Sequence, residues 1–305
     1  MDQNLPGFVI VDERGAPVGP IRDGASVIFF NFRGDRAIEI TRAFEEEGFR
    51  GFDRGARPDV FYAGMMQYDG DLRLPTHFLV APPAIDRTLG EYLAASGVAQ
   101  LAISETQKFG HVTYFWNGNR TEPFDASSER YLEIPSDPLP FEERPWMKAA
   151  EITDRLIEEL ETRRYRHARV NYANGDMVGH TGVRDAAVIA VEAVDLCLGR
   201  LLPVVRALGG AMIVTADHGN ADEMFELDKK TGKPADNGRG GFKAKTSHTL
   251  NLVPCHVYAP GYDVTIDPSV QAPGLANLAA TVLHLMGYAA PPGYLPSLVR
   301  IGGES

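Results

Sequence analysis

The chain has 305 residues, of which 44% are apolar, and its 41 acidic and 30 basic side chains give a formal net charge of −11. The apolar content supports a packed core and excludes a largely disordered chain, and the acidic balance argues against nucleic-acid binding. No apolar run approaches the ~18 residues of a membrane span, and the few cysteines exclude a disulfide framework. The first residues carry neither a basic start nor an apolar segment, so no signal peptide is expected in them. We therefore expect a soluble, cytoplasmic protein with two domains, or with one large domain and an appendage.

The first part of the chain contains few predicted elements. The apolar run 27–32 predicts a strand, a helical pattern follows it and ends at Gly48, and the apolar run 60–62 predicts a second strand. The stretch that follows is rich in polar residues and then in prolines, which predicts a domain boundary near residue 82. That boundary divides the chain into residues 1–82 and 83–305.

The second part alternates helices and strands. Predicted helices cover residues 89–95, 146–164, 185–208 and 275–286. Predicted strands cover residues 98–103, 168–172, 211–215 and 253–259, whereas residues 119–145, with five prolines, are expected to form a long loop. This alternation predicts an α/β fold with a mainly parallel sheet flanked by helices. Ligands bind to such sheets at the carboxyl ends of the strands.

A polar segment lies between two of these strands. Residues 226–247 carry six basic and three acidic side chains. The segment is typical of a solvated surface loop, and the alternative is a mobile lid beside an anionic substrate.

Asp176 and His180 lie in the segment NYANGDMVGHTG (171–182), directly after the predicted strand 168–172. On a helical turn, residues four apart lie on the same face. A carboxylate beside an imidazole suits a divalent ion such as Mn²⁺ or Zn²⁺. An Asp-x-x-x-His pair alone is a weak signal, and its position at a strand end is what favours a metal site.

Two further segments carry metal-ligand residues beside strands. Asp217 and His218 directly follow the strand 211–215, where adjacent side chains point in different directions and can serve neighbouring ions. The alternative is that Asp217 caps the next element and His218 lies on the surface. His248 precedes the strand 253–259 and would alone be interpreted as structural. Together the three segments supply the carboxylates and imidazoles of a two-metal phosphoryl-transfer site.

Three basic residues are candidates for anion binding. Arg33 and Arg36 follow the first predicted strand, and arginine forks bind phosphate and carboxylate bidentately. The alternative is a surface ion pair with Asp35 or Glu39. Lys108, in SETQKFGH, is by itself typical of a solvated lysine.

Taken together, these segments resemble the cofactor-independent (2,3-bisphosphoglycerate-independent) phosphoglycerate mutases. The matching segments, in order, are FFNFRGDRA (29–37), SETQKFGHVTYFWNG (104–118), NYANGDMVGHTG (171–182), TADHGNAD (215–222) and KTSHTLNLVP (245–254). The resemblance implies an alkaline-phosphatase-like metalloenzyme with two divalent metal ions, manganese in that family. It further implies that Asp176, His180 and His248 hold one ion, and that Asp217 and His218 hold the other.

The resemblance also implies a reaction and a substrate. Arg33 and Arg36 would belong to the remnant of a transferase lobe within residues 1–82 and would hold the substrate, a phosphoglycerate. Lys108 would reach the phosphoryl group between the ions. The implied activity interconverts 3-phosphoglycerate and 2-phosphoglycerate, with a metal-bound serine that takes the phosphoryl group and returns it to the other hydroxyl. Neither a nucleic acid nor a membrane is an expected partner.

The chain departs from the family at its N-terminus. The family's nucleophilic serine and one further aspartate ligand lie near the start of longer chains, and residues 1–26 match neither. We therefore expect a C-terminal portion of such an enzyme, without turnover alone. One alternative is a non-catalytic, metal-binding half of a split enzyme, which a separate N-terminal chain would complete. The other is a different metal-dependent phosphatase or phosphomutase, against which the segments RGDR and SETQK argue.

Overall fold

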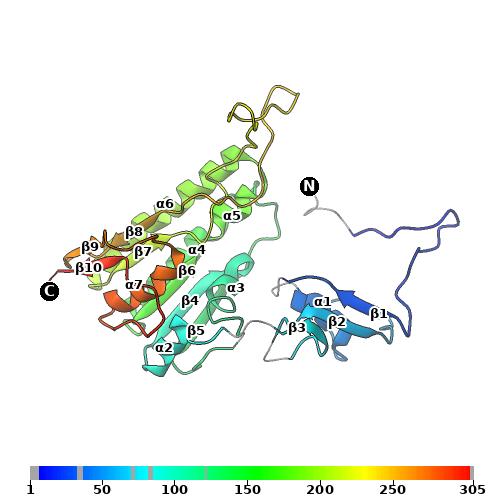
Figure 1. The fold of residues 1–305 in the computed structure, drawn as a ribbon, viewed down its shortest axis with the longest axis horizontal. Helices are drawn as coiled ribbons and strands as arrows, with labels where there is room; N and C mark the ends of the chain where they lie inside the picture. Colours follow the sequence, from blue (N-terminus) through cyan, green and yellow to red (C-terminus); the bar gives the residue numbers. More distant parts are fainter. Residues whose placement is uncertain (1–6, 33–36, 70–72, 82–84, 121, 303–305) are drawn as a thin grey trace. The chain divides into compact units, whose positions relative to one another are not determined.

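A computed structural model describes the chain except for residues 1–6, 33–36, 70–72, 82–84, 121 and 303–305. The chain forms two compact units (Figure 1). Unit 1 contains residues 1–86 and 118–122, and unit 2 contains residues 87–117 and 123–305. The predicted boundary near residue 82 itself falls outside the described residues.

Unit 1 is built on a small parallel sheet. Its strands are β1 (Ser26–Phe29), β2 (Phe61–Met66) and β3 (Phe78–Val80), in the order β1-β2-β3. Helix α1 (Ala37–Glu45) packs on the sheet through Phe44, whose ring stacks on that of Tyr62 with centroids 4.9 Å apart. The predicted strands at 27–32 and 60–62 are confirmed in part, because β1 begins and ends earlier and β2 extends further.

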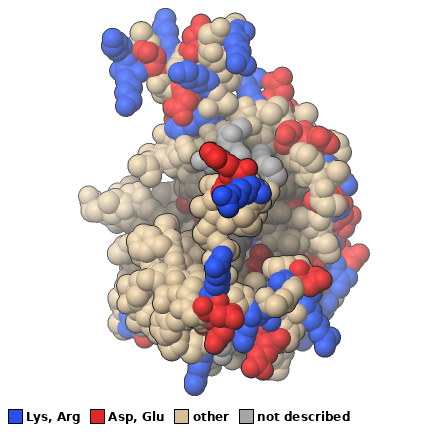
Figure 2. Space-filling view, turned by 90° about the vertical axis from the view of Figure 1, so that its right-hand side faces the viewer, with Lys and Arg blue, Asp and Glu red and all other residues tan. Residues whose placement is uncertain are grey.

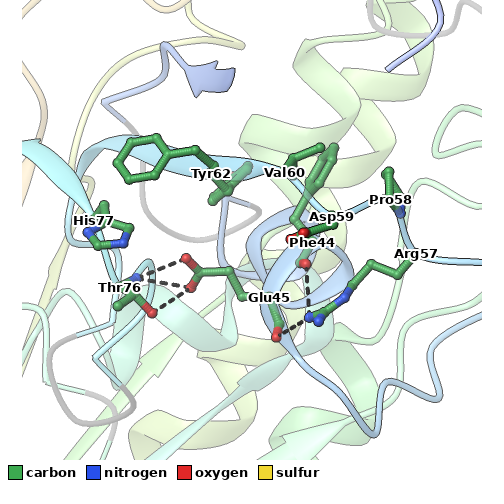
Figure 3. A pocket seen from close by; sticks show the side chains of 10 residues that line it. Phe44, Glu45, Arg57, Pro58, Asp59, Val60, Tyr62, Thr76 and His77 are labelled. Carbon is green, nitrogen blue, oxygen red and sulfur yellow. Dashed lines mark hydrogen bonds between the residues drawn. The ribbon is translucent and has the colours of Figure 1, made fainter. Parts of the chain in front are cut away.

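A pocket in unit 1 lies between the end of α1 and the strand β2 (Figure 3). Glu45 accepts hydrogen bonds from the backbone N (2.9 Å) and the hydroxyl (3.3 Å) of Thr76. Arg57 donates to the carbonyl oxygens of Phe44 and Glu45, at 3.4 and 2.8 Å. These two charged side chains therefore fasten the helix end to the neighbouring segments.

Unit 2 is built around a parallel sheet in the order β5-β4-β6. The strands are β4 (Gln100–Glu105), β5 (Glu129–Ile134) and β6 (His167–Asn171), and β4 is buried along its whole length. The prediction of a long loop over residues 119–145 is wrong at residues 129–134, which form strand β5. The sequence ERYLEI has no clear strand pattern, and β5 forms because its backbone hydrogen-bonds to β4.

Helices cover both faces of this sheet. Leu101 and Ile103 of β4 pack against α4 (Ala149–Glu161) and α6 (Arg184–Ala207). Gln100 points to the opposite face, because side chains alternate along a strand, and its amide donates to the carbonyl of Gly90 in α2 (Leu89–Ala95), 3.0 Å away. Helix α7 (Leu278–Leu285) packs beside α2. The predicted helices are thus confirmed, with ends shifted by a few residues and with a short η3 (Leu275–Asn277) before α7.

The remaining strands of unit 2 form two antiparallel pairs. Strand β7 (Met212–Thr215) pairs with β8 (Cys255–Tyr258), and β9 (Val264–Ile266) pairs with β10 (Val299–Ile301). The fold was expected to be mainly parallel, and these two pairs are the antiparallel exceptions to that arrangement. The sequences of β7 and β8, MIVT and CHVY, are apolar or mixed and carry no information about strand direction.

Residues 225–244 form an arm that extends from unit 2, at the top of Figure 1. Three isolated antiparallel bridges hold its two sides together: Phe225 with Ala244, Leu227 with Pro234, and Asp236 with Phe242. Basic and acidic side chains mix on the arm (Figure 2). This agrees with the solvated segment expected there, and the lid interpretation stays a prediction. In the described part of the chain, no helix has the length and apolar character needed to cross a bilayer.

Candidate metal centre

The candidate residues of unit 2 lie at strand ends. Lys108 belongs to η2 (Thr106–Lys108), which directly follows β4. Asp176 belongs to α5 (Asn174–Gly179), shortly after β6, and His180 caps the end of that helix. Asp217 and His218 follow β7, and His248 precedes β8. The carboxyl ends of β4, β6 and β7 thereby supply most of the site, as expected for an α/β sheet.

Asp176, His180 and His248 converge on one point. The Nε2 atoms of the two histidines lie 3.0 Å apart, and each lies 3.0 Å from Oδ1 of Asp176. We call these three residues the Asp/His triad. Of the described residues, they are the group of three His, Cys, Asp or Glu side chains whose ligand atoms can reach one ion.

Lys108, which follows β4, contacts the carboxylate of the triad. Its ammonium group donates to Oδ2 of Asp176, and its side chain is only 5% exposed. The other oxygen of this carboxylate, Oδ1, faces the two histidines. A buried lysine paired with a carboxylate in this way is not the solvated lysine that its local sequence alone suggests.

The surroundings of Asp176 stabilise its charged form. Burial raises the pKa of this carboxyl, but hydrogen bonds with His180 and Lys108 outweigh burial and hold the pKa well below its usual range. The hydrogen bond with Asp176 raises the pKa of His180. His180 also donates from Nδ1 to the carbonyl of Thr246, 2.6 Å away, which directs Nε2 toward the triad.

The second predicted pair, Asp217 and His218, lies beside the triad. The ring of His218 stacks on that of His248, with centroids 3.7 Å apart and planes at 19°. His218 Nε2 lies 3.6 Å from Asp217 Oδ2, and the side chain of Asp217 is 52% exposed. Burial lowers the pKa of His248, which favours the neutral imidazole that metals bind. The role of this pair as a second metal site stays a prediction.

Arg33 and Arg36 lie outside the described residues, so the structure does not test them.

A residue of the site that the sequence did not point to is Asn220. Its amide donates to Oδ1 of Asp176, at 2.7 Å, although the two residues are far apart in the chain. The only signal in the sequence was its place in TADHGNAD, two residues after His218.

The triad fits a divalent metal ion. Ligand atoms at mutual distances of 3.0 Å can all reach one ion at bond lengths of about 2.0–2.2 Å. One carboxylate oxygen and two imidazole nitrogens are donors that Mn²⁺, Zn²⁺ and Co²⁺ accept. The hydrogen bond from His180 to Thr246 is the outer contact that metal-binding histidines commonly make.

An α/β sheet with converging carboxylate and imidazole donors at its strand ends is typical of a metal-binding protein. The chain belongs to the Metalloenzyme superfamily, whose family model matches residues 21–290. The family resemblance and the α/β fold expected from the sequence are thereby confirmed. Together, family and triad support the binding of a divalent metal.

Individual relatives are closely similar over nearly the whole chain. A probable 2,3-bisphosphoglycerate-independent phosphoglycerate mutase of Leptospira interrogans is 57% identical over 300 residues, which cover 98% of this chain and 54% of the relative. The 2,3-bisphosphoglycerate-independent phosphoglycerate mutase of Trypanosoma brucei brucei is 50% identical over 302 residues, which cover 98% of this chain and 55% of the relative. A crystal structure of Leishmania mexicana phosphoglycerate mutase, at low cobalt concentration, superimposes with a TM-score of 0.93 and 51% identity, covering 95% of this chain and 53% of that one. The chain spans about half the length of the curated relatives it matches.

Glu105, at the end of β4, gives a prediction about pH. Its side chain is buried and accepts hydrogen bonds from the hydroxyl of Ser136 (2.8 Å) and the backbone N of Lys148 (3.2 Å). Burial raises its pKa. A carboxyl whose pKa is raised by folding favours the folded state at low pH, and this contribution is lost as the pH rises through the folded-state pKa.

We therefore expect Glu105→Gln to become more stable relative to the wild type as the pH rises from 4 to 7. Urea unfolding followed by circular dichroism, in metal-free buffer at several pH values, measures this difference. Glu133→Gln, which changes an exposed carboxylate on β5, is the control. A difference between Glu105→Gln and wild type that is the same at every pH would contradict the expectation.

Proposed function

We propose that this chain is the metal-binding part of a cofactor-independent phosphoglycerate mutase, which interconverts 3-phosphoglycerate and 2-phosphoglycerate. The observation that carries the proposal is the convergence of Asp176, His180 and His248 on one point, with the buried Lys108 against the same carboxylate. The similarity to phosphoglycerate mutases over nearly the whole chain supports the same activity.

Each residue has a task in this proposal. Divalent ions, when bound, polarise phosphoryl oxygens and lower the pKa of a bound hydroxyl. Lys108 places a positive charge beside the phosphoryl group, where it stabilises the charge that develops during transfer. Arg33 and Arg36 hold the carboxylate and phosphate of the substrate, and unit 1 is part of the lobe that binds it.

We propose two Mn²⁺ ions for the complete enzyme. The first is held by the Asp/His triad and the second by Asp217 and His218. Two ligands hold an ion weakly, so the second site needs at least one further donor. The exposure of Asp217 leaves its carboxylate accessible to an ion and to such a donor.

That donor, and the nucleophilic serine, belong in our proposal to an N-terminal segment that acts together with this chain in the cytoplasm. The relatives' greater length supports this assignment. The alternative, a metal-binding half without a catalytic role of its own, is favoured by the same difference in length.

The test is a coupled assay of 2-phosphoglycerate formation from 3-phosphoglycerate with added Mn²⁺. We expect no turnover from the 305-residue chain alone, and turnover after addition of the N-terminal segment of a full-length relative. His180→Ala, in the triad, is expected to abolish the complemented activity. A folded, metal-binding chain that stays inactive after complementation favours the non-catalytic alternative. Hydrolysis of p-nitrophenyl phosphate without conversion of phosphoglycerate favours a different phosphatase.

A further inference from the structure

Asn220 lies between two parts of the candidate metal centre. Its side chain is buried, with 5% of the residue exposed. The amide nitrogen donates to Oδ1 of Asp176, at 2.7 Å, and to the backbone carbonyl of the same residue, at 3.1 Å. Asn220 thereby joins the segment after β7 to helix α5, which carries the triad's carboxylate.

The orientation of this amide is determined by charge. The NH₂ group of Asn220 must face Asp176, because the amide oxygen in that position would lie against a negatively charged carboxylate. The amide oxygen therefore points the other way, where it is buried and has no hydrogen-bond partner. A buried acceptor without a partner is costly, so the contact with Asp176 is maintained against a penalty.

Gly179 makes room for that oxygen. A Cβ at position 179 would lie 2.4 Å from Oδ1 of Asn220 and 2.8 Å from its Cγ. Gly179 is helical and has an ordinary negative φ, so backbone conformation does not require a glycine there. The requirement comes from Asn220.

The carboxylate of Asp176 is consequently fixed at both oxygens. Lys108 contacts Oδ2, whereas Asn220 contacts Oδ1, the oxygen that the two histidines face. Without Asn220, Lys108 still holds Oδ2, but Oδ1 loses the contact that keeps it in the direction that the triad needs.

We propose that Asn220 is a positioning residue that orients the Asp176 carboxylate for metal binding, and that Gly179 is required because it accommodates Asn220. The inference rests on the metal centre of the proposed function. It assigns Asn220 no contact with the ion or the substrate.

The experiment measures binding of Co²⁺ and of Mn²⁺ to the metal-free 305-residue chain by titration calorimetry, together with the visible absorption of the Co²⁺ complex. Asn220→Leu preserves the side-chain size and removes the donor. We expect it to weaken binding by about 10- to 100-fold, as loss of an outer contact to a metal ligand commonly does, and to change the Co²⁺ spectrum. Asn251→Leu is the matched control, because the Asn251 amide donates at the same 2.7 Å to Asp222, a carboxylate outside the triad.

Gly179→Ala is expected to weaken binding to a similar degree, by displacing Asn220. In an Asn220→Ala background the obstructing atoms are gone, so Gly179→Ala should cause no further loss. This non-additivity is a readout that general destabilisation does not produce. The melting temperature of each metal-free variant identifies variants that fail to fold, and the comparison uses folded ones.

Wild-type affinity and spectrum in folded Asn220→Leu would overturn the inference while leaving the proposed function intact. Additive losses in the double variant would overturn the assignment of Gly179. A folded wild-type chain that binds neither ion would contradict the proposed metal centre and, with it, the role of Asn220.

Discussion

Asp176→Asn is expected to weaken Mn²⁺ binding by about 100-fold or more, because loss of a ligand exceeds the loss of an outer contact. It should also destabilise the metal-free chain, since Lys108, 5% exposed, would be left without its counter-ion. Breaking a buried ion pair from one side costs about 3–5 kcal/mol. Calorimetric titration with Mn²⁺ measures the first effect, and urea unfolding in the absence of metal measures the second.

The two effects of Asp176→Asn can be separated. In Asp176→Asn with Lys108→Met the unpaired charge is removed, so stability should recover in large part while metal binding stays lost. Asp185→Asn, which changes a side chain that is 90% exposed, is the control for loss of one negative charge. Tight Mn²⁺ binding by folded Asp176→Asn would show that the triad is not the metal centre.

Lys108→Met is expected to have opposite effects on binding and on turnover. Removing the ammonium group takes away a positive charge that repels the ion, and we expect this gain to offset the loss of its contact with Oδ2 of Asp176. The variant should therefore bind Mn²⁺ at least as tightly as the wild type. Turnover should fall by about 10²–10³-fold, the typical cost of losing one group that stabilises transition-state charge. Turnover is measured in the chain complemented by the N-terminal segment, and binding in the chain alone.

Lys148→Met is the matched control for Lys108→Met. Lys148 is also largely buried, at 15% exposure, and is paired with a carboxylate, Asp137, at 2.7 Å. We expect its loss to affect stability and to leave turnover per folded molecule unchanged. Unchanged turnover in Lys108→Met would contradict the role of that lysine at the phosphoryl group.

The sequence was sufficient for elements whose local pattern and tertiary environment agree. The largely apolar run 98–103, interrupted by Gln100, predicted β4, which is indeed buried on both faces. The long apolar pattern predicted α6 to within a residue at either end. Strand β5 was missed because its charged sequence lies among prolines and gains its hydrogen bonds only from β4.

The same distinction applies to the candidate site. Residue type and position at strand ends singled out Asp176, His180 and His248, which the structure brings together. Asn220 could not be found in this way, because its amide acts only through a carboxylate far away in the chain. Burial likewise distinguishes Lys108 from ordinary solvated lysines, and burial at that position depends on the whole sheet.

The arm at residues 225–244 also bears on how the chain responds to a protease. Its lysines and arginine are exposed, and isolated bridges rather than a regular strand ladder join its two sides, so trypsin is expected to cleave there. Such a cut places Asp176 and His180 on one fragment and His248 on the other. An ion held by all three would then be a cross-link between two separate polypeptides, and a chelator would weaken their association. Unlike a disulfide, this cross-link would be reversible and independent of the redox state of the solution.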